Sequence, residues 1–187
     1  LADLLSNLAR WSPDNSSIAF VPYADLTALR VVRTGGGEEH DVAKFSAPIA
    51  DVQWSPNGKF LRVAVADVAG GPKHFYDVSA PDARPVPVLE GWNHEAGSGT
   101  WIGDHRFVFA SFDNGNLSRV DEGNRRAVDF TAGPLRFMRP LWVPQANALL
   151  ALGQSQRGEL RRYDGRRRVF DPFLSGISAD CLSFSPD

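Results

Sequence analysis

The residues that could do metal or acid–base chemistry are few and scattered. The 187-residue chain has four histidines, His40, His74, His94 and His105. No two of them have a His-x-His or His-x-x-x-His spacing that would place two imidazoles on one metal ion. His94 and His105 each stand beside a carboxylate residue and flank one predicted loop, where they could meet at a metal, but their spacing is generic. We therefore predict no metal ion and no cofactor.

Nucleophilic residues do not form a catalytic pattern either. The nearest approach to the Gly-x-Ser-x-Gly elbow of serine hydrolases is residues 153–157, which ends in Arg157 instead of glycine. This stretch also lies between two predicted strands, not between a strand and a helix. The single Cys181 excludes an internal disulfide and stands beside Leu182, as a small buried side chain would. The sequence predicts that this segment is not an enzyme and has no catalytic residues.

A cluster of arginines near the C-terminus is the charged feature most able to bind a ligand. It comprises Arg157, Arg161, Arg162, Arg166, Arg167 and Arg168. On a hairpin, both strands would present guanidinium groups at one outer edge, where they could contact phosphates. A charged edge strand that discourages aggregation explains the same residues more simply. With 20 Lys and Arg against 22 Asp and Glu, the balance of charge predicts no nucleic-acid binding through this segment.

Aromatic side chains offer another means of binding. Trp92, Phe112 and Tyr23 could line one face of the molecule and bind a peptide or a sugar. The segment 113–116 resembles a calcium loop but lacks the further carboxylates such a loop requires, so it is predicted to be a hairpin turn. The candidate binding residues are Trp92, His94, His105, Arg161, Arg162 and Arg166.

An internal repeat provides the elements that must position these residues. Five aromatic residues are followed by a turn or an apolar strand, and they are Trp11, Trp54, Trp101, Trp142 and Phe184. Their spacings are 43, 47, 41 and 42 residues. A period in the low forties with strand-like content is typical of the blades of a β-propeller.

The residues of one unit support this interpretation. The aromatic residue ends a strand, and Ser-Pro-Asp or Ser-Pro-Asn then makes a tight turn, in which proline presets φ and the Asp or Asn caps the bend. The following strand, such as 60–65, is apolar at nearly every position, which predicts burial on both faces. A propeller meets that need because each blade packs between two others. The third unit has Ile102-Gly103 and the fourth has Val143, so we expect their turns to be built differently.

Two more strands can be identified in the units, joined by turns such as Asp164-Gly165. The sequence therefore predicts an all-β chain made of four-stranded antiparallel blades. The predicted blades are residues 8–46, 50–90, 98–131 and 139–173, with a further blade starting at 181–187. The residues of the repeat motif are Trp11, Ser12, Pro13, Asp14, Trp54, Ser55, Pro56, Asn57, Gly58, Trp101, Asp104, Trp142, Pro144, Phe184, Ser185, Pro186 and Asp187.

Repeated Trp-Ser-Pro-Asp followed by an apolar strand resembles the WD-like repeat of TolB-type bacterial β-propellers, and this resemblance covers nearly the whole chain. Four stretches are similar to one subgroup, the propellers placed C-terminal to winged-helix or protein kinase domains in bacterial regulators. These stretches are 89–93, 131–135, 156–164 and 174–179. The resemblance implies a fold and does not supply a site.

On this basis we expect a non-catalytic propeller module that serves as a sensory or protein–protein interaction platform in a bacterial regulator. The alternative is a propeller that gates substrate access to a separate hydrolase domain in a prolyl-oligopeptidase-type enzyme. The expected partners are a protein or peptide and the remaining blades of the same propeller, since a six-bladed ring would need roughly 258 residues at this period. No stretch of the sequence is apolar enough to cross a membrane, and the compartment is not specified.

Overall fold

The computed structural model describes residues 8–66, 68, 71–79, 84–89, 91–155 and 159–173. The chain divides into two compact units, Leu1–Gln154 and Ser155–Asp187. The described residues are almost all strands and turns, and the one helix among them is a 3-10 turn, η1 (Pro144–Ala146). This confirms the predicted all-β fold. No helix in the described part of the chain has the length and apolar character needed to span a membrane.

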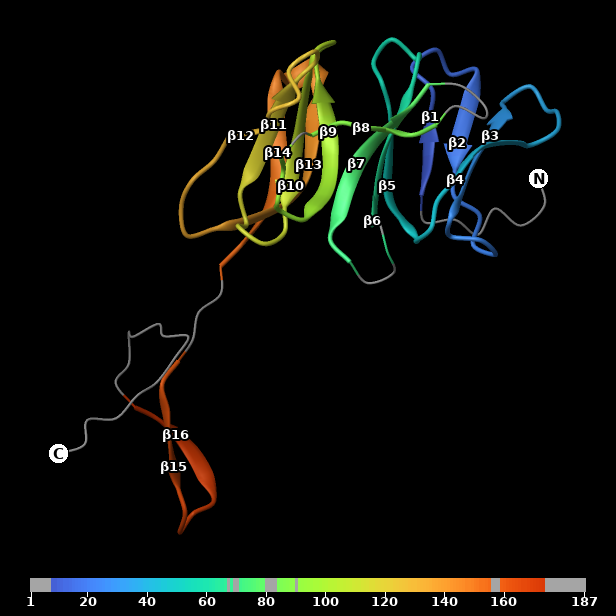
Figure 1. The fold of residues 1–187 in the computed structure, drawn as a ribbon. Coiled ribbons are helices and arrows are strands. Elements are labelled where there is room, and N and C mark those ends of the chain that lie inside the picture. The colour runs from blue at the N-terminus through green and yellow to red at the C-terminus, as the bar shows by residue number, and fades with distance from the viewer. Residues whose placement is uncertain are drawn as a thin grey trace. The chain divides into compact units, whose positions relative to one another are not determined.

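The first unit contains three four-stranded antiparallel sheets, each in simple sequence order (Figure 1). Blade 1 is β1 (Ala9–Trp11), β2 (Ser17–Phe20), β3 (Ala28–Arg33) and β4 (His40–Lys44). Blade 2 is β5 (Ile49–Trp54), β6 (Leu61–Ala66), β7 (Lys73–Val78) and β8 (Val86–Pro87). Blade 3 is β9 (Ala96–Ile102), β10 (Arg106–Ser111), β11 (Leu117–Asp121) and β12 (Val128–Asp129). Antiparallel four-stranded sheets in this order are the blades that the repeat predicts.

The fourth repeat is divided between the two units. In the first unit, β13 (Arg136–Val143) pairs with β14 (Ala148–Gln154). In the second unit, β15 (Arg161–Asp164) pairs with β16 (Val169–Pro172). One four-stranded blade over 139–173 therefore stays a prediction. The expected start of another blade at 181–187, including Phe184, Ser185, Pro186 and Asp187, lies outside the described residues.

The tryptophans of the four repeats occupy equivalent positions in their sheets. Each one lies near the end of the first strand and pairs with the first or second residue of the strand that follows. The pairs are Trp11 with Ile18, Trp54 with Leu61, Trp101 with Phe107 and Trp142 with Leu149. Since side chains alternate along a strand, residues at a fixed offset from these tryptophans lie on matching faces of the four sheets.

A buried serine organises the turn after the tryptophan in blades 1 and 2. Ser55 donates its hydroxyl to Oδ1 of Asn57 at 2.9 Å and accepts the N–H of Phe60 at 3.0 Å. Ser12 bonds in the same way to Asp14 and to the N–H of Ser17. The residue that completes the bend is left-handed in both turns, Asn15 at φ 59° and Gly58 at φ 69°.

The turns of the third and fourth repeats are built differently. A three-residue turn containing Gly103 at φ 59° and Asp104 joins β9 to β10. The turn between β13 and β14 is η1 (Pro144–Ala146), which is followed by Asn147 in a left-handed conformation. Proline suits the first position of η1 because an N–H at that position would have no acceptor within the helix.

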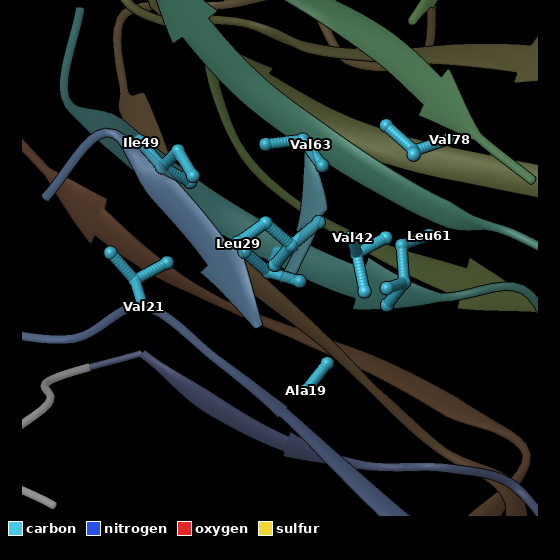
Figure 2. Close-up of a cluster of buried hydrophobic side chains, with 9 residues drawn as sticks. Ala19, Val21, Leu29, Val42, Ile49, Leu61, Val63 and Val78 are labelled. Atoms are coloured by element: carbon cyan, nitrogen blue, oxygen red, sulfur yellow. The ribbon is translucent and has the colours of Figure 1, made fainter. Parts of the chain in front are cut away.

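The second strands of blades 2 and 3 are buried on both faces, as their apolar sequences predict. In β6, Leu61 and Val63 pack against blade 1 in a cluster with Ala19, Val21 and Leu29 (Figure 2). The other face of β6 packs against blade 3.

On that other face, Ala64 joins an aromatic cluster with Phe75, Phe107 and Phe109. Arg62 lies on the same face, holds Asp77 with two hydrogen bonds of 2.8 and 2.9 Å, and places its guanidinium 4.5 Å from the ring of Trp101. The buried guanidinium of Arg62 thus forms an ion pair and a cation–π contact at the same time.

Candidate functional site

The first strands of the four repeats line a cleft of about 810 Å³. β1 contacts β5, β5 contacts β9, and β9 contacts β13, so the four strands follow one another around it. Among the lining residues, each repeat contributes the two that stand one and three positions before its tryptophan. They are Leu8 and Arg10, Asp51 and Gln53, Ser98 and Thr100, and Arg139 and Leu141. Period-two alternation puts Asp51 and Gln53 on one face of β5, and Ser98 and Thr100 on one face of β9.

Apolar side chains from blade 1 and the start of blade 2 form one wall of the cleft. They are Leu8, Val21, Tyr23, Leu26 and Ile49. Tyr23 is 69% exposed and Leu26 is also exposed, whereas Val21 and Ile49 are buried. The cleft therefore combines an apolar wall with polar side chains from the other strands, which is the composition of sites that bind small molecules or peptides.

Asp51 is the buried acid of the cleft and connects three blades. Its side chain accepts from Arg10 of β1 at 3.2 Å and from the backbone N–H of Gly99 of β9 at 3.0 Å. Gln53 lies at 3.4 Å from the same carboxylate. Burial raises the pKa of Asp51, and the Gly99 N–H and the Arg10 guanidinium oppose that shift. With only 3% of its surface exposed, Asp51 positions its neighbours and does not itself face solvent.

Gly99 is required where it approaches Asp51. A Cβ atom at this position would lie 2.3 Å from the ring of Phe107, so no side chain fits without moving that buried ring. The absence of a side chain lets β9 lie flat against β10 while its N–H donates to the carboxylate across the blade boundary. The position of Asp51 therefore depends on this glycine.

Arg139 has an unusual backbone conformation within β13. Its φ is 50°, and the pairing of β13 with β14 shifts register between Met138 and Leu141. A left-handed non-glycine residue followed by Pro140 costs free energy that the surrounding structure must offset. The bulge directs an exposed arginine to the cleft, in place of the regular pleat.

A hydrogen bond from a tryptophan side chain to the backbone joins blades 1 and 2 beside the cleft. The indole N–H of Trp54 donates to the carbonyl oxygen of Arg10 at 3.0 Å. Farther along the ring of strands, the N–H of Trp142 donates to the hydroxyl of Thr100 at 3.3 Å. Trp54, through its indole, and Trp142, through its backbone N–H, therefore connect neighbouring inner strands beside the cleft.

The structure does not bring His94 and His105 together. Nδ1 of His94 lies 2.6 Å from Asp113, beside the turn between β10 and β11. Nδ1 of His105 lies 3.1 Å from Glu122, beside the turn between β11 and β12 at the opposite end of the blade. The segment between the two histidines is strand β9, where a loop was expected. Within the described ranges, no cluster of His, Cys, Asp and Glu has the geometry of a metal site.

Ser111, Asp113 and His94 come together but not as a catalytic triad. The hydroxyl of Ser111 donates to Asp113 at 2.8 Å, and His94 contacts the other oxygen of the same carboxylate. A triad needs histidine between the other two groups so that it can take the serine proton. Here the carboxylate is central and Ser111 is fully buried. At the other candidate, Gly153 lies within strand β14, so residues 153–155 do not form a nucleophile elbow.

Of the three aromatic residues considered for binding, only Tyr23 lines the cleft. Trp92 packs on Phe109 at 5.4 Å and on His94 at 4.9 Å between ring centroids, so it belongs to the edge of the core. Phe112 lies beneath the ammonium of Lys73, 5.6 Å from its ring centroid.

The arginines of the second unit are largely engaged within their own hairpin. Arg161 pairs with Glu159 at 2.9 Å, and the guanidinium of Arg162 lies 5.5 Å from the ring of Phe173. Residues 166–168 were expected in a strand, but they form the turn between β15 and β16. Asp164 holds that turn by accepting the N–H groups of Arg166 and Arg167. The expected row of guanidinium groups along two strands is therefore wrong, since only Arg161 and Arg162 lie in one.

Sequence reasoning missed Arg10, Asp51 and Arg139 because it searched for residues clustered along the chain. These three come from three different repeats and line one cleft only when the first strands follow one another in the fold. The signal that could have found them is the pair of positions one and three residues before each repeat tryptophan, which includes at least one polar side chain in every repeat.

No protein-family model matches the chain. Among curated proteins, it is 29% identical over 136 residues to a subunit of eukaryotic translation initiation factor 3 from Lodderomyces elongisporus, a match that covers 64% of this chain and 19% of that protein. The chain thus spans about a fifth of the curated relative.

Solved structures share the fold at low sequence identity. TolB from Acinetobacter baumannii superposes with a TM-score of 0.64 at 17% identity, over 88% of this chain and 42% of that one. TolB from Agrobacterium tumefaciens gives 0.60 at 13% identity, over 70% and 50%. The tricorn protease gives 0.61 at 9% identity, over 92% and 23%. The four-stranded antiparallel blades and these superpositions together identify the fold of this chain as a β-propeller of the TolB type.

Proposed function

We propose that this segment is a non-catalytic propeller module whose inner cleft binds a segment of another protein. The observation that carries the proposal is the cleft itself, in which equivalent positions of four repeats join an apolar wall to polar side chains. A peptide offers matching groups, because its backbone is polar and its side chains can be apolar. The histidine and serine geometries described above supply no nucleophile activated by a base, which favours binding over catalysis.

The wider role that we propose is a sensory or interaction platform in a bacterial regulator with several domains. Its support is the resemblance of four stretches of the sequence to propellers that follow winged-helix or kinase domains. The curated relative is a subunit of a larger factor, which is in line with a binding role. The remaining blades of the same propeller would then be the first partner of this segment.

A second candidate is a propeller that gates access to a peptidase domain. The observation in its favour is that the tricorn protease contains the same fold. The two roles differ in what adjoins the propeller: gating needs an α/β domain with a Gly-x-Ser-x-Gly elbow in the same protein, and a regulator needs a winged-helix or kinase domain. Sequencing of the full gene decides between them.

Binding in the cleft can be tested with a pool of random synthetic hexapeptides. The full chain is mixed with the pool, protein-bound peptides are separated by size exclusion, and mass spectrometry identifies them. We expect a subset of peptides to be retained uncut, and Tyr23→Ala to weaken their binding at least about fivefold because it removes an exposed aromatic of the apolar wall.

The control is Tyr163→Ala, which removes an exposed tyrosine of the second unit and should leave binding unchanged. Retention of no peptide at all, or equal loss in both variants, would refute a binding site in the cleft. Peptide fragments that accumulate with time would refute the non-catalytic role.

A further inference from the structure

The charges of the cleft are unbalanced, and this observation deepens the proposed function, on which the following inference rests. Besides the tyrosine, the ionisable side chains that line the cleft are Arg10, Asp51 and Arg139. The lining thus holds two guanidinium groups and one carboxylate, of which Arg10 and Asp51 are paired. With Asp51 ionised, the lining carries one unit of positive charge, which a ligand with a single negative charge would neutralise.

Arg10 is held in place and still has donors to offer. One of its terminal nitrogens bonds to Asp51 at 3.2 Å and the other to the neighbouring carbonyl of Ala9 at 3.1 Å. A guanidinium has five N–H donors, so these two contacts leave others available. Its side chain is 36% exposed, so the unused donors can reach a ligand.

The side chain of Arg139 forms no hydrogen bond or ion pair within the described part of the chain. It is exposed, and a left-handed backbone conformation that disfavours an ordinary side chain brings it to the cleft. Arginine is the side chain best suited to a planar, singly charged carboxylate, because its forked donors match the two oxygens. Strain at a residue without an internal partner is typical of a binding position.

One wall of the cleft is apolar, and Leu8 of this wall stands two residues before Arg10. Leu8, Val21 and Leu26 line it together with the ring of Tyr23. A ligand that places a carboxylate near the arginines therefore meets an apolar surface a short distance away. The free C-terminus of a peptide that ends in an apolar residue combines these two groups.

We propose that the inner cleft recognises a carboxylate beside an apolar side chain, with Arg139 and Arg10 contacting the carboxylate and the blade 1 wall contacting the side chain. Asp51 acts as a positioning residue that holds Arg10. The carboxylate can come from a peptide C-terminus or from an acidic side chain near the end of the peptide, and the two sources differ in their response to amidation.

The test uses three versions of one hexapeptide that ends in leucine, each labelled with fluorescein at its N-terminus. The first version has a free C-terminal acid, the second a C-terminal amide, and the third a C-terminal amide with glutamate before the leucine. Fluorescence anisotropy with the full chain gives the three dissociation constants. We expect the acid to bind at least about tenfold more tightly than the plain amide, since a hydrogen-bonded charge pair is lost. If the glutamate amide binds as tightly as the acid, carboxylate recognition holds and either source serves; if it binds as weakly as the plain amide, the C-terminus is the source.

Arg139→Asn removes the charge but suits the left-handed backbone, so the variant should fold. We expect it to weaken the acid about tenfold and to leave the plain amide unchanged, with partial recovery in Arg139→Lys. The control, Arg33→Asn, removes an exposed arginine at the end of β3 that does not line the cleft, and should change nothing.

Equal binding of acid and amide, with both still weakened by Tyr23→Ala, would overturn carboxylate recognition and leave the proposed peptide platform intact. Binding of none of the three peptides, together with retention of nothing from the random pool, would overturn both.

Discussion

Single polar side chains determine how the turns and inner strands of this propeller are fixed. Ser55 and Ser12 each satisfy a backbone N–H five residues along and a side-chain acceptor two residues along. Asp51 similarly joins β1 to β9 across β5. The turn could be predicted from Pro and Asp in the sequence, but the bonding of the serine hydroxyl could not, because it depends on burial.

Replacement of Ser55 by alanine should destabilise the chain by about 1–3 kcal/mol, because the part-buried N–H of Phe60 would lose its partner. Urea unfolding followed by tryptophan fluorescence measures this change. Ser79→Ala, at an exposed serine with no such role, is the control and should change the free energy of unfolding by less than about 0.5 kcal/mol. Equal effects in the two variants would show that the Ser55 hydroxyl does not hold the turn.

The same turn in blade 1 predicts a pH effect. Hydrogen bonds from the hydroxyl of Ser12 and from the N–H and hydroxyl of Ser16 lower the pKa of Asp14 to about 2. Because the folded pKa lies below the unfolded one, the stabilisation is complete above about pH 4 and disappears as the pH falls toward 2. NMR titration of the side-chain carboxyl carbon should show this pKa, and Ser12→Ala should raise it toward 3.8. An unchanged pKa in the variant would contradict the bonding pattern.

At the level of the strands, burial follows from what lies on each side of a sheet. The sequence of β6, apolar at every position except Arg62, correctly predicts that both of its faces are covered. In β14, Leu149 and Ala151 pack toward blade 3, while Leu150 and Leu152 are exposed. The sequence of β14 predicts two buried faces as strongly as that of β6 does, so the difference comes from the sheets around the strand and not from the strand itself.

Two leucine-to-alanine substitutions measure this difference. Leu61→Ala in β6, where 2% of the residue is exposed, should cost about 2–5 kcal/mol of unfolding free energy because it leaves a cavity between blades 1 and 2. Leu150→Ala in β14, where 55% is exposed, should cost less than about 1 kcal/mol. Chemical denaturation of the two variants gives both values. A loss at Leu150 as large as that at Leu61 would mean that another surface covers this face of β14 in solution.

For the whole molecule, the repeat in the sequence predicts the fold, whereas the candidate site could be recognised only from the structure. Four tryptophans at regular spacing specify the blades, because each blade is a local unit. The cleft takes Arg10, Asp51 and Arg139 from separate blades, and the bulge at Arg139 has no signal in the sequence beyond the proline after it. The sequence suggested both Tyr23 and Trp92 as possible binding residues. Tyr23 lines the cleft, whereas Trp92 packs at the edge of the core.

The most direct test of a ligand site among the inner strands is to locate bound peptide through the tryptophan indoles. The chain has five tryptophans, whose indole N–H signals can be assigned by single substitutions to phenylalanine and followed by ¹⁵N NMR during titration with the acid hexapeptide. The signal of Trp54 should shift, because its indole donates to the carbonyl of Arg10 beside the cleft, while that of Trp92, which does not line the cleft, should stay in place. A shift of Trp92 without a shift of Trp54 would contradict a binding site in the inner cleft.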